Sequence, residues 1–293
     1  MKLTNGFYTA LGTPIDENGN LVAESLKKHI EQQIEAGASG LLLMGSMGIE
    51  AYLKLSTFTE AVKVGVQANN GRLPMFVGVM DTSIAKVMEK IEAIGDAKID
   101  GVVLTASFYS LMGNAQAVYY FNEIANRSPF PVYLYDLAVT VRYKITMPVI
   151  DQLISNENIK GIKTADWELI HKIGRKYPEK KFECLYSGLD SFDYANVMGI
   201  TKNLDGMFAC TPKNGRKMYD CIANGDYVGA RKYLDNILLL RDTMAATGGL
   251  MRAFTYCMNL LGCEGNFHQD YVPEISDEAK AKVKNVFVEI GEI

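Results

Sequence analysis

The stretch Ile159-Lys160-Gly161-Ile162-Lys163-Thr164-Ala165-Asp166 places a lysine near the end of a β-branched run, and a helix-like segment from Trp167 through Ile173 follows at once. This pattern predicts a strand joined directly to a helix. Burying an ammonium without a partner costs free energy or neutralises it, so a lysine normally avoids the inward-facing end of a strand. A neutralised lysine is a nucleophile. Either Lys163 is exposed at a strand edge, or its placement serves chemistry.

The same β-then-α unit recurs along the chain. Several β-rich runs are apolar nearly throughout, as is typical of parallel strands that are covered on both faces. The eight predicted strands are Gly6–Thr13, Gly40–Gly45, Met75–Met80, Gly101–Thr105, Val132–Leu137, Ile159–Thr164, Phe182–Ser187 and Gly206–Thr211.

Segments with apolar residues at i, i+3, i+4 and i+7 lie between these runs and predict amphipathic helices. They are the segment around Leu26–Ile34, then Thr57–Ala68, Ser83–Ile94, Ala115–Asn126, Met147–Ser155, Glu168–Lys176, Phe192–Met198 and Gly215–Asn224. Eight such units favour an α/β fold of the closed (β/α)8 TIM-barrel type over an open sheet.

Only helices follow the eighth unit. They are predicted over Tyr227–Ala246, Gly249–Leu261 and Ser276–Ile290. We therefore expect a barrel over residues 1–225 and a C-terminal helical extension over 226–293 that packs on it within the same domain.

Composition excludes several functional classes. With 293 residues, 48% hydrophobic, the chain can bury a large core. Its net charge of −4 argues against a nucleic-acid partner, and no apolar run is long enough to span a membrane. The first six residues lack the apolar stretch of a signal peptide. The odd number of scattered cysteines, 5, favours reduced thiols in a cytoplasmic protein, and the 3 separated histidines indicate no metal site.

Three predicted strand ends converge on one mouth of the barrel, where active sites of this fold lie. Lys163 ends the sixth strand, Tyr135 the fifth, and Gly45-Ser46-Met47-Gly48 follows the second. A sheltered lysine amine can attack a ketone to form an imine, which then acts as an electron sink. We expect kcat/KM to rise with pH as that amine loses its proton.

The two other features of the mouth each allow a second interpretation. Tyr135 is either a proton shuttle for the lysine or a core tyrosine with a satisfied hydroxyl. The glycine-flanked turn either binds a carboxylate through its backbone N–H groups or simply joins a strand to a helix.

The chain resembles the dihydrodipicolinate synthase/N-acetylneuraminate lyase family of class I pyruvate aldolases over nearly its whole length. The resemblance is carried by Ala10-Leu11-Gly12-Thr13-Pro14-Ile15, Gly45-Ser46-Met47-Gly48, Tyr135, Gly161-Ile162-Lys163 and Ser187-Gly188-Leu189-Asp190, which come in the order and spacing of that family. It implies a TIM barrel that assembles as a homotetramer, a dimer of dimers, and needs no cofactor.

The resemblance also implies residue roles. Lys163 would form the Schiff base with a 2-keto acid and Tyr135 would shuttle the proton. Ser46 and Met47 would bind the carboxylate through their backbone, and the Ser46 hydroxyl would join a relay with Tyr135 and Tyr109. The tyrosine matching Tyr109 is lent by the adjacent subunit in many family members. Phe208, placed on the eighth strand, matches a position whose backbone contacts pyruvate.

Departures from the family pattern concern the substrate more than the chemistry. Thr140 stands where dihydrodipicolinate synthases carry an arginine, which makes a role in lysine biosynthesis less favoured. Ser46, in place of a threonine, and Asp190 are compatible with sugar-acid lyases, whereas Ser191 replaces an acid that sialic acid lyases use. Gly188, next to Asp190 in the matched segment, is a further candidate for substrate binding. We expect the distal pocket to be lined by Glu50, Asp136, Thr140, Arg142, Thr164, Asp190, Ser191 and Cys210.

The sequence therefore predicts a carbon–carbon lyase that cleaves or forms a 2-keto acid with imine-bound pyruvate. The substrate would be N-acetylneuraminate or a 2-keto-3-deoxy sugar acid, cleaved to pyruvate and an aldehyde or sugar. The alternatives are a dihydrodipicolinate synthase, a Schiff-base dehydratase of a 2-keto-3-deoxy acid, and a non-catalytic barrel that binds a keto acid.

Overall fold

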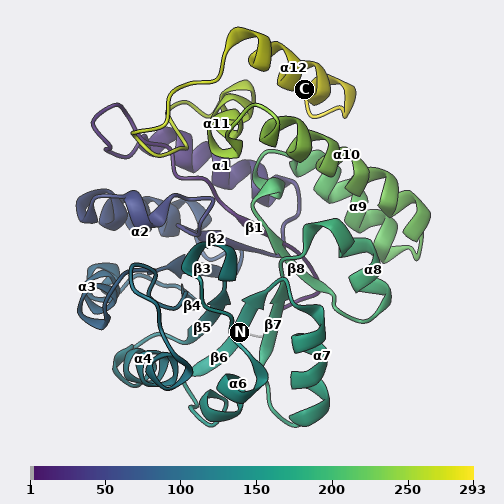
Figure 1. The fold of residues 1–293 in the computed structure, drawn as a ribbon. Helices are drawn as coiled ribbons and strands as arrows, with labels where there is room; N and C mark the ends of the chain where they lie inside the picture. The colour runs from purple at the N-terminus through teal and green to yellow at the C-terminus, as the bar shows by residue number, and fades with distance from the viewer. Residues whose placement is uncertain (1–2) are drawn as a thin grey trace.

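The computed structural model describes residues 3–293, so the first two residues of the predicted barrel range lie outside it. Its strands form a closed, all-parallel barrel in chain order, with β1 hydrogen-bonded to both β2 and β8. The predicted (β/α)8 barrel with C-terminal helices is therefore confirmed (Figure 1). The strands are β1 (Gly6–Ala10), β2 (Gly40–Leu43), β3 (Met75–Gly78), β4 (Gly101–Leu104), β5 (Val132–Asp136), β6 (Ile159–Thr164), β7 (Glu183–Tyr186) and β8 (Lys202–Asp205).

Helices cover the outside of the barrel because each buries one apolar face against the strands. They are α1 (Ala23–Glu35), α2 (Leu55–Asn69), α3 (Ile84–Ile94), α4 (Asn114–Arg127), α6 (Met147–Leu153), α7 (Trp167–Lys176), α8 (Phe192–Val197) and α9 (Pro212–Ala223). Short helical turns that the sequence pattern did not predict are η1 (Glu50–Tyr52), α5 (Ala138–Val141), η2 (Leu189–Ser191) and η3 (Met207–Ala209).

The predicted position of the eighth strand is wrong. The strand is Lys202–Asp205, and the predicted run Gly206–Thr211 instead forms η3 and the short link to α9, which ends at the N-cap residue Thr211. The hydropathy pattern does not reveal the true strand because several of its side chains are polar. One of them, Lys202, pairs with Glu183 at 2.8 Å. The apolar run after it is buried beneath the helices, and a short apolar run does not by itself distinguish a strand from a helical turn.

A ring of side chains fills the barrel interior as a core distinct from the layer between strands and helices. Its floor includes the ring of Tyr133, which lies against Gly161 on β6. A Cβ atom at Gly161 would come within 2.8 Å of that ring and 2.2 Å of the Glu183 carbonyl oxygen. Glycine is therefore required here, and Lys163, two residues further along β6, lies nearer the open mouth.

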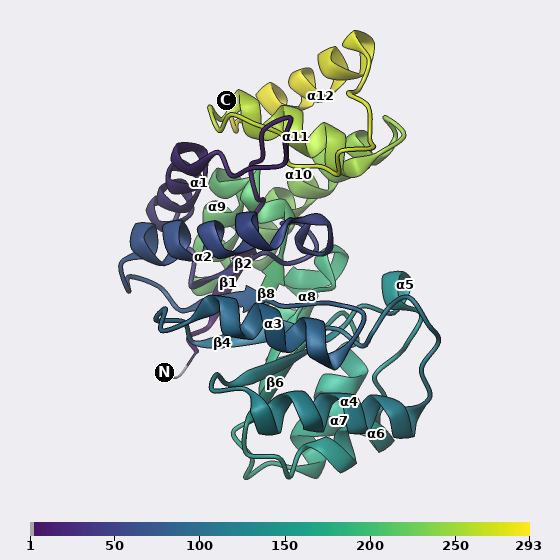
Figure 2. The same cartoon turned by 90° about the vertical axis from the view of Figure 1, so that its left-hand side faces the viewer.

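The C-terminal helices α10 (Tyr227–Ala245), α11 (Leu250–Leu260) and α12 (Asp277–Glu289) gather on one side of the barrel, next to α1 and α9 (Figures 1 and 2). The chain end also binds the barrel directly, because the buried Glu292 carboxylate accepts the backbone N–H of Asn214 at 2.8 Å. Over residues 3–293, none of the helices has the length and apolar composition needed to cross a bilayer.

Candidate active site

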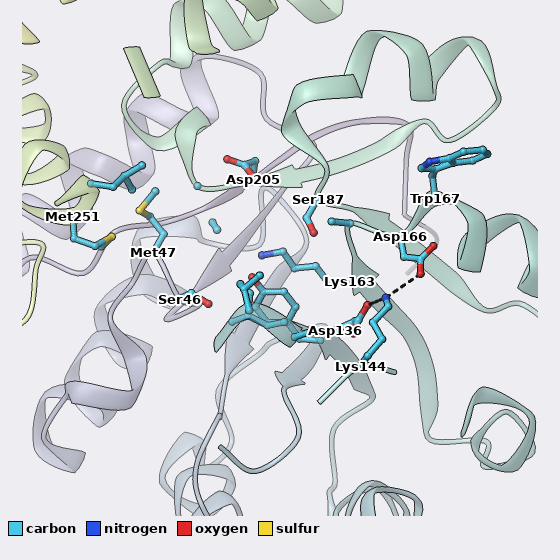
Figure 3. Close-up of a pocket in the computed structure, with 18 of the residues that line it drawn as sticks. Ser46, Met47, Asp136, Lys144, Lys163, Asp166, Trp167, Ser187, Asp205 and Met251 are labelled. Carbon is cyan, nitrogen blue, oxygen red and sulfur yellow. Dashed lines mark hydrogen bonds and ion pairs between the residues drawn. The ribbon is translucent and has the colours of Figure 1, made fainter. Parts of the chain in front are cut away.

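A cavity of about 770 Å³ opens at the C-terminal ends of the strands. It contains four of the residues singled out in the sequence: Ser46, Met47, Tyr135 and Lys163. Figure 3 labels Ser46, Met47 and Lys163. The four residues come from β5, β6 and the turn after β2, elements that lie far apart in the sequence and meet at the mouth because the barrel closes. The cavity is the candidate active site.

Lys163 is only 5% exposed, so an exposed lysine at a strand edge is ruled out. It lies beside Tyr135 in the register of β5 and β6, and its Nζ is 4.0 Å from the centroid of the Tyr135 ring. Within residues 3–293, no carboxylate forms an ion pair with Nζ, although Lys163 lines the cavity. The amine is sheltered from bulk water and stabilised by an aromatic face.

The turn after β2 exposes backbone donors at the cavity. Gly48 N–H donates to Gly45 O at 2.9 Å and Ile49 N–H donates to Ser46 O at 3.2 Å, which folds the turn. In the described part of the chain, the N–H groups of Ser46 and Met47 donate to no backbone carbonyl. Unpaired N–H groups in such a turn suit a bound anion.

The turn holds an unusual backbone conformation. Met44 and the buried Ile49 both adopt positive φ, at 53° and 48°. A β-branched residue in the left-handed region is strained, and such strain persists only where the surroundings enforce it. The surroundings include Lys90 of α3, whose Nζ binds the Glu50 carboxyl group at 2.5 Å and Asp81 at 2.9 Å.

An ion-paired cluster forms one wall of the cavity. Lys144 pairs with Asp136 and, at 3.0 Å, with Asp166 (Figure 3). Asp136 also accepts the Thr164 hydroxyl at 2.8 Å. Burial disfavours the charge on Lys144, but its hydrogen bonds to the two carboxylates outweigh that effect and raise its pKa. The cluster leaves no free cation in this wall.

The opposite wall comes from the end of β8 and from α11, through Asp205, Gly206, Leu250 and Met251. Burial raises the pKa of the Asp205 carboxyl, while a backbone N–H of Met207 and the charge of Lys163 act against that rise. The C-terminal helices therefore take part in the site itself.

The six other candidates from the sequence lie outside the lining of this cavity. Tyr109 is 90% exposed in the loop between β4 and α4, and Thr140 is exposed on α5. Asp190 binds Arg241 at 2.6 Å. Of the remaining three, Gly188 lies just before η2, Ser191 lies in η2, and Phe208 lies in η3.

Local packing explains where those three residues lie. The Ser191 hydroxyl is 2.8 Å from the Tyr186 hydroxyl, and that same Tyr186 side chain covers Gly188. Phe208 is fully buried, with its ring centroid 5.0 Å from that of Phe7. Phe208 thus follows β8 on η3 and does not belong to the strand.

The expected distal pocket also changes. Only Asp136 of its predicted residues lines the cavity; Glu50 and Cys210 are buried elsewhere, and Thr164 acts through its bond to Asp136. Sequence reasoning missed Lys144, Asp166, Asp205 and Met251. The displaced eighth strand concealed Asp205, while no pattern in the sequence marks Lys144 or Met251. In residues 3–293 no group of three His, Cys, Asp or Glu side chains is placed to hold a metal ion.

Comparison with known proteins gives a consistent family. The model of the dihydrodipicolinate synthetase family matches residues 3–289. A 4-hydroxy-tetrahydrodipicolinate synthase of Methanosarcina mazei is 25% identical over 98% of both chains. A second, from Ligilactobacillus salivarius, is 25% identical over 78% of this chain and 80% of its own.

Solved structures share the fold. CdNal from Clostridium difficile, in complex with mannosamine, superposes with a TM-score of 0.87 at 19% identity, covering 98% of this chain and 99% of its own. YagE, a prophage protein from E. coli K12 in complex with pyruvate, gives a TM-score of 0.89 at 20% identity, covering 99% and 100%.

Proposed function

Because this chain belongs to the dihydrodipicolinate synthetase family, a family of pyruvate-dependent Schiff-base aldolases, we propose that Lys163 forms an imine with pyruvate or with a 2-keto acid that yields pyruvate. One observation carries the proposal: a buried lysine amine, without an ion-pair partner in the described chain, lines the large cavity at the barrel mouth. A lysine in such surroundings is suited to covalent catalysis on a carbonyl group.

The neighbouring groups fit the rest of the reaction. The keto acid carboxylate binds the N–H groups of Ser46 and Met47, which places its C2 carbon at Lys163. The protonated imine withdraws electrons, so the bond between C3 and C4 of a longer keto acid breaks to give an enamine and an aldehyde. Tyr135 carries the proton that leaves the C4 hydroxyl, and the Ser46 hydroxyl joins that relay.

The cavity favours a substrate without a second carboxylate. The cationic side chains of its walls are Lys163 and Lys144, and Lys144 already holds two carboxylates. Thr140, which stands at the arginine position of the synthases, lies exposed outside the lining. We therefore propose a lyase acting on a 2-keto-3-deoxy sugar acid or on N-acetylneuraminate.

Dihydrodipicolinate synthesis is the second candidate, since the curated relatives carry the name 4-hydroxy-tetrahydrodipicolinate synthase. It requires aspartate semialdehyde, whose own carboxylate would need a cation that the cavity does not offer. A dehydratase would use the same imine but release no pyruvate from its keto acid, so product analysis separates it from a lyase.

We also propose that Tyr109 acts in the site of a second copy of the chain within a homotetramer. Its 90% exposure leaves the side chain available to a neighbouring subunit. Phe208 retains only its proposed backbone role. Gly188, Asp190, Ser191 and Thr140 would contact only a substrate tail that extends beyond the cavity.

Borohydride trapping tests the proposed function. Pyruvate plus borohydride should add one reduced adduct to the peptide containing Lys163, seen by mass spectrometry. Lys163→Ala should abolish the adduct and lower turnover by at least about 10⁴-fold, as loss of a covalent nucleophile does. Lys144→Ala is the matched control: it removes the other lysine of the cavity, and Lys163 should still be trapped. Absence of any adduct on the wild-type protein would overturn the proposal.

A panel of keto acids then identifies the substrate. Pyruvate release from sugar acids, with no condensation of pyruvate and aspartate semialdehyde, is the expected result. The reverse pattern would establish the synthase instead.

A further inference from the structure

Asp205 is a carboxyl group in the cavity that the mechanism above does not use. It ends β8, borders the same cavity as Lys163, and lies on the other side of that lysine from the Asp136–Lys144 pair (Figure 3). Its Oδ1 accepts the backbone N–H of Met207 at 2.8 Å, which fixes the carboxyl where the chain turns out of the strand. The group is therefore both positioned and accessible from the cavity.

The charged groups around Asp205 indicate that Lys163 is the cation with which it interacts. The cations that act on it are Lys163 from β6 and Arg241 from α10. Arg241 is already neutralised by Asp190 at 2.6 Å and Asp242 at 2.8 Å. Lys163 has no such partner within residues 3–293, and burial makes Asp205 hold its proton more readily than an ordinary aspartate.

Resting on the proposed function, we propose that Asp205 is a further catalytic residue: the general acid that expels water as the imine forms on Lys163. The arrangement of the groups supports this role. In the described chain no ion pair within 4.0 Å joins Lys163 to Asp205. A keto acid bound to Lys163 would place its C2 oxygen in the cavity that Asp205 also lines.

The step is balanced in atoms and charge. The Lys163 nitrogen bonds to C2, and after a proton moves from nitrogen to oxygen the product is a neutral carbinolamine. Asp205 then gives its proton to the C2 hydroxyl, the C–O bond breaks, and water leaves. The nitrogen lone pair forms the second C–N bond. The products are a cationic imine, one water and the Asp205 carboxylate, which stabilises the new charge across the cavity.

This assignment divides the proton transfers between two groups. Asp205 works on the C2 oxygen, and in the reverse direction its carboxylate takes a proton from the water that hydrolyses the imine. Tyr135, whose ring lies against the amine, remains available for the C4 hydroxyl.

The rate of borohydride trapping with pyruvate tests the inference. Asp205→Asn keeps an oxygen for the Met207 N–H but has no acidic proton, and it should slow trapping by about 10²-fold, a typical effect of losing a general acid. Asp205→Glu should recover part of the rate. The wild-type rate should pass through a maximum with pH, because Lys163 must lose its proton and Asp205 must keep its own. The fall on the alkaline side should be absent in Asp205→Asn.

Asp242→Asn is the matched control, because it removes a carboxylate beside Arg241 without touching the cavity, and it should trap at the wild-type rate. If Asp205→Asn does not fold, Asp205→Ser replaces it, since serine also offers an oxygen to the turn. Wild-type rates in the folded variant would overturn the role of Asp205 and leave the proposed function intact. Failure of the wild-type protein to form any adduct would instead overturn the proposed function.

Discussion

Buried charges in this protein are held in place by specific partners. Lys90 of α3 joins the Glu50 carboxyl group, Asp81 and the Met80 carbonyl oxygen at 2.5, 2.9 and 2.8 Å. Burial raises the pKa of Glu50 to about 8 even though Lys90 acts against that rise, so the ionised partner of Lys90 is Asp81. Glu50 directly follows the strained turn that presents Ser46 and Met47. The Lys90 cluster therefore fixes the turn from outside the cavity. Loss of one of the carboxyl groups that Lys90 binds should lower the stability of the protein more than its catalytic rate.

Asp81→Asn tests that cluster through pH. Burial opposes ionisation of Asp81, but the Thr82 N–H and the two lysines outweigh it and lower its pKa from 3.8 to about 2. Because folding lowers the pKa of Asp81, its ionised carboxylate stabilises the folded protein above pH 3.8. This stabilisation is lost as the pH falls toward 2. The variant should lose about 1–3 kcal/mol at pH 7, the cost of removing a charged hydrogen-bond partner.

Urea denaturation at pH 7 and pH 3 measures this difference, which should be smaller at the lower pH. Asp235→Asn provides the control, since its exposed pair with Arg231 should be worth less than about 1 kcal/mol. A deficit of equal size at both pH values would contradict the ionised state assigned to Asp81.

The helices show how local sequence sets element boundaries. Ser83 caps α3 by accepting the Lys86 N–H at 3.3 Å, and Asp166 caps α7 by accepting the Leu169 N–H at 2.8 Å. Asp166 also holds Lys144, so one carboxylate both begins a helix and shapes the cavity wall. Short polar residues are preferred at the first position of a helix, so the start of a helix can be recognised in the sequence.

The end of α2 offers a prediction at this scale. Asn70 ends the helix in the left-handed region, at φ 47°, with its side chain exposed. Glycine adopts that conformation without a steric penalty. Asn70→Gly should therefore leave stability unchanged or raise it by up to about 1 kcal/mol, whereas Asn70→Val should lower it by about 1–2 kcal/mol. Thermal unfolding of the two variants measures the contrast; equal midpoints would contradict it.

In the whole molecule the C-terminal helices are bound to the barrel and contribute to its site. Leu250 and Met251 of α11 line the cavity, and α10 packs along α9. Beyond α12, the Glu292 carboxylate accepts the backbone N–H groups of Lys213 and Asn214 at 3.2 and 2.8 Å. These are among the first residues of α9, where a helix has unpaired donors and a partial positive charge.

Glu292→Ala should destabilise the whole protein, because it leaves those buried donors unpaired. We expect a loss of about 1–3 kcal/mol, and Glu292→Gln should lose less because it keeps an acceptor. Urea denaturation measures both values. Glu289→Ala, at the exposed end of α12, is the control and should change stability by less than about 0.5 kcal/mol. Equal stability of Glu292→Ala and wild type would show that this contact does not hold the chain end.

The sequence by itself determined the repeating units, the closed barrel and the lysine–tyrosine pair at its mouth. Periodicity and strand ends are local properties, and parallel strands necessarily place their C-terminal ends on one side. Lys163 and Tyr135 therefore could be predicted to share a cavity. The eighth strand could not be located, because Lys202 and Asn203 are polar while the buried run after them is apolar.

Only the tertiary structure decided which other side chains reach the cavity. Lys144 meets Asp166, and Asp205 shares a cavity with Lys163 and with Met251 of a helix beyond the barrel. Asp190 instead binds Arg241, and Phe208 enters the core. These positions depend on how elements distant in the sequence pack together and on which charged groups lie next to each side chain after folding. The spacing of residues along one segment does not determine either of these.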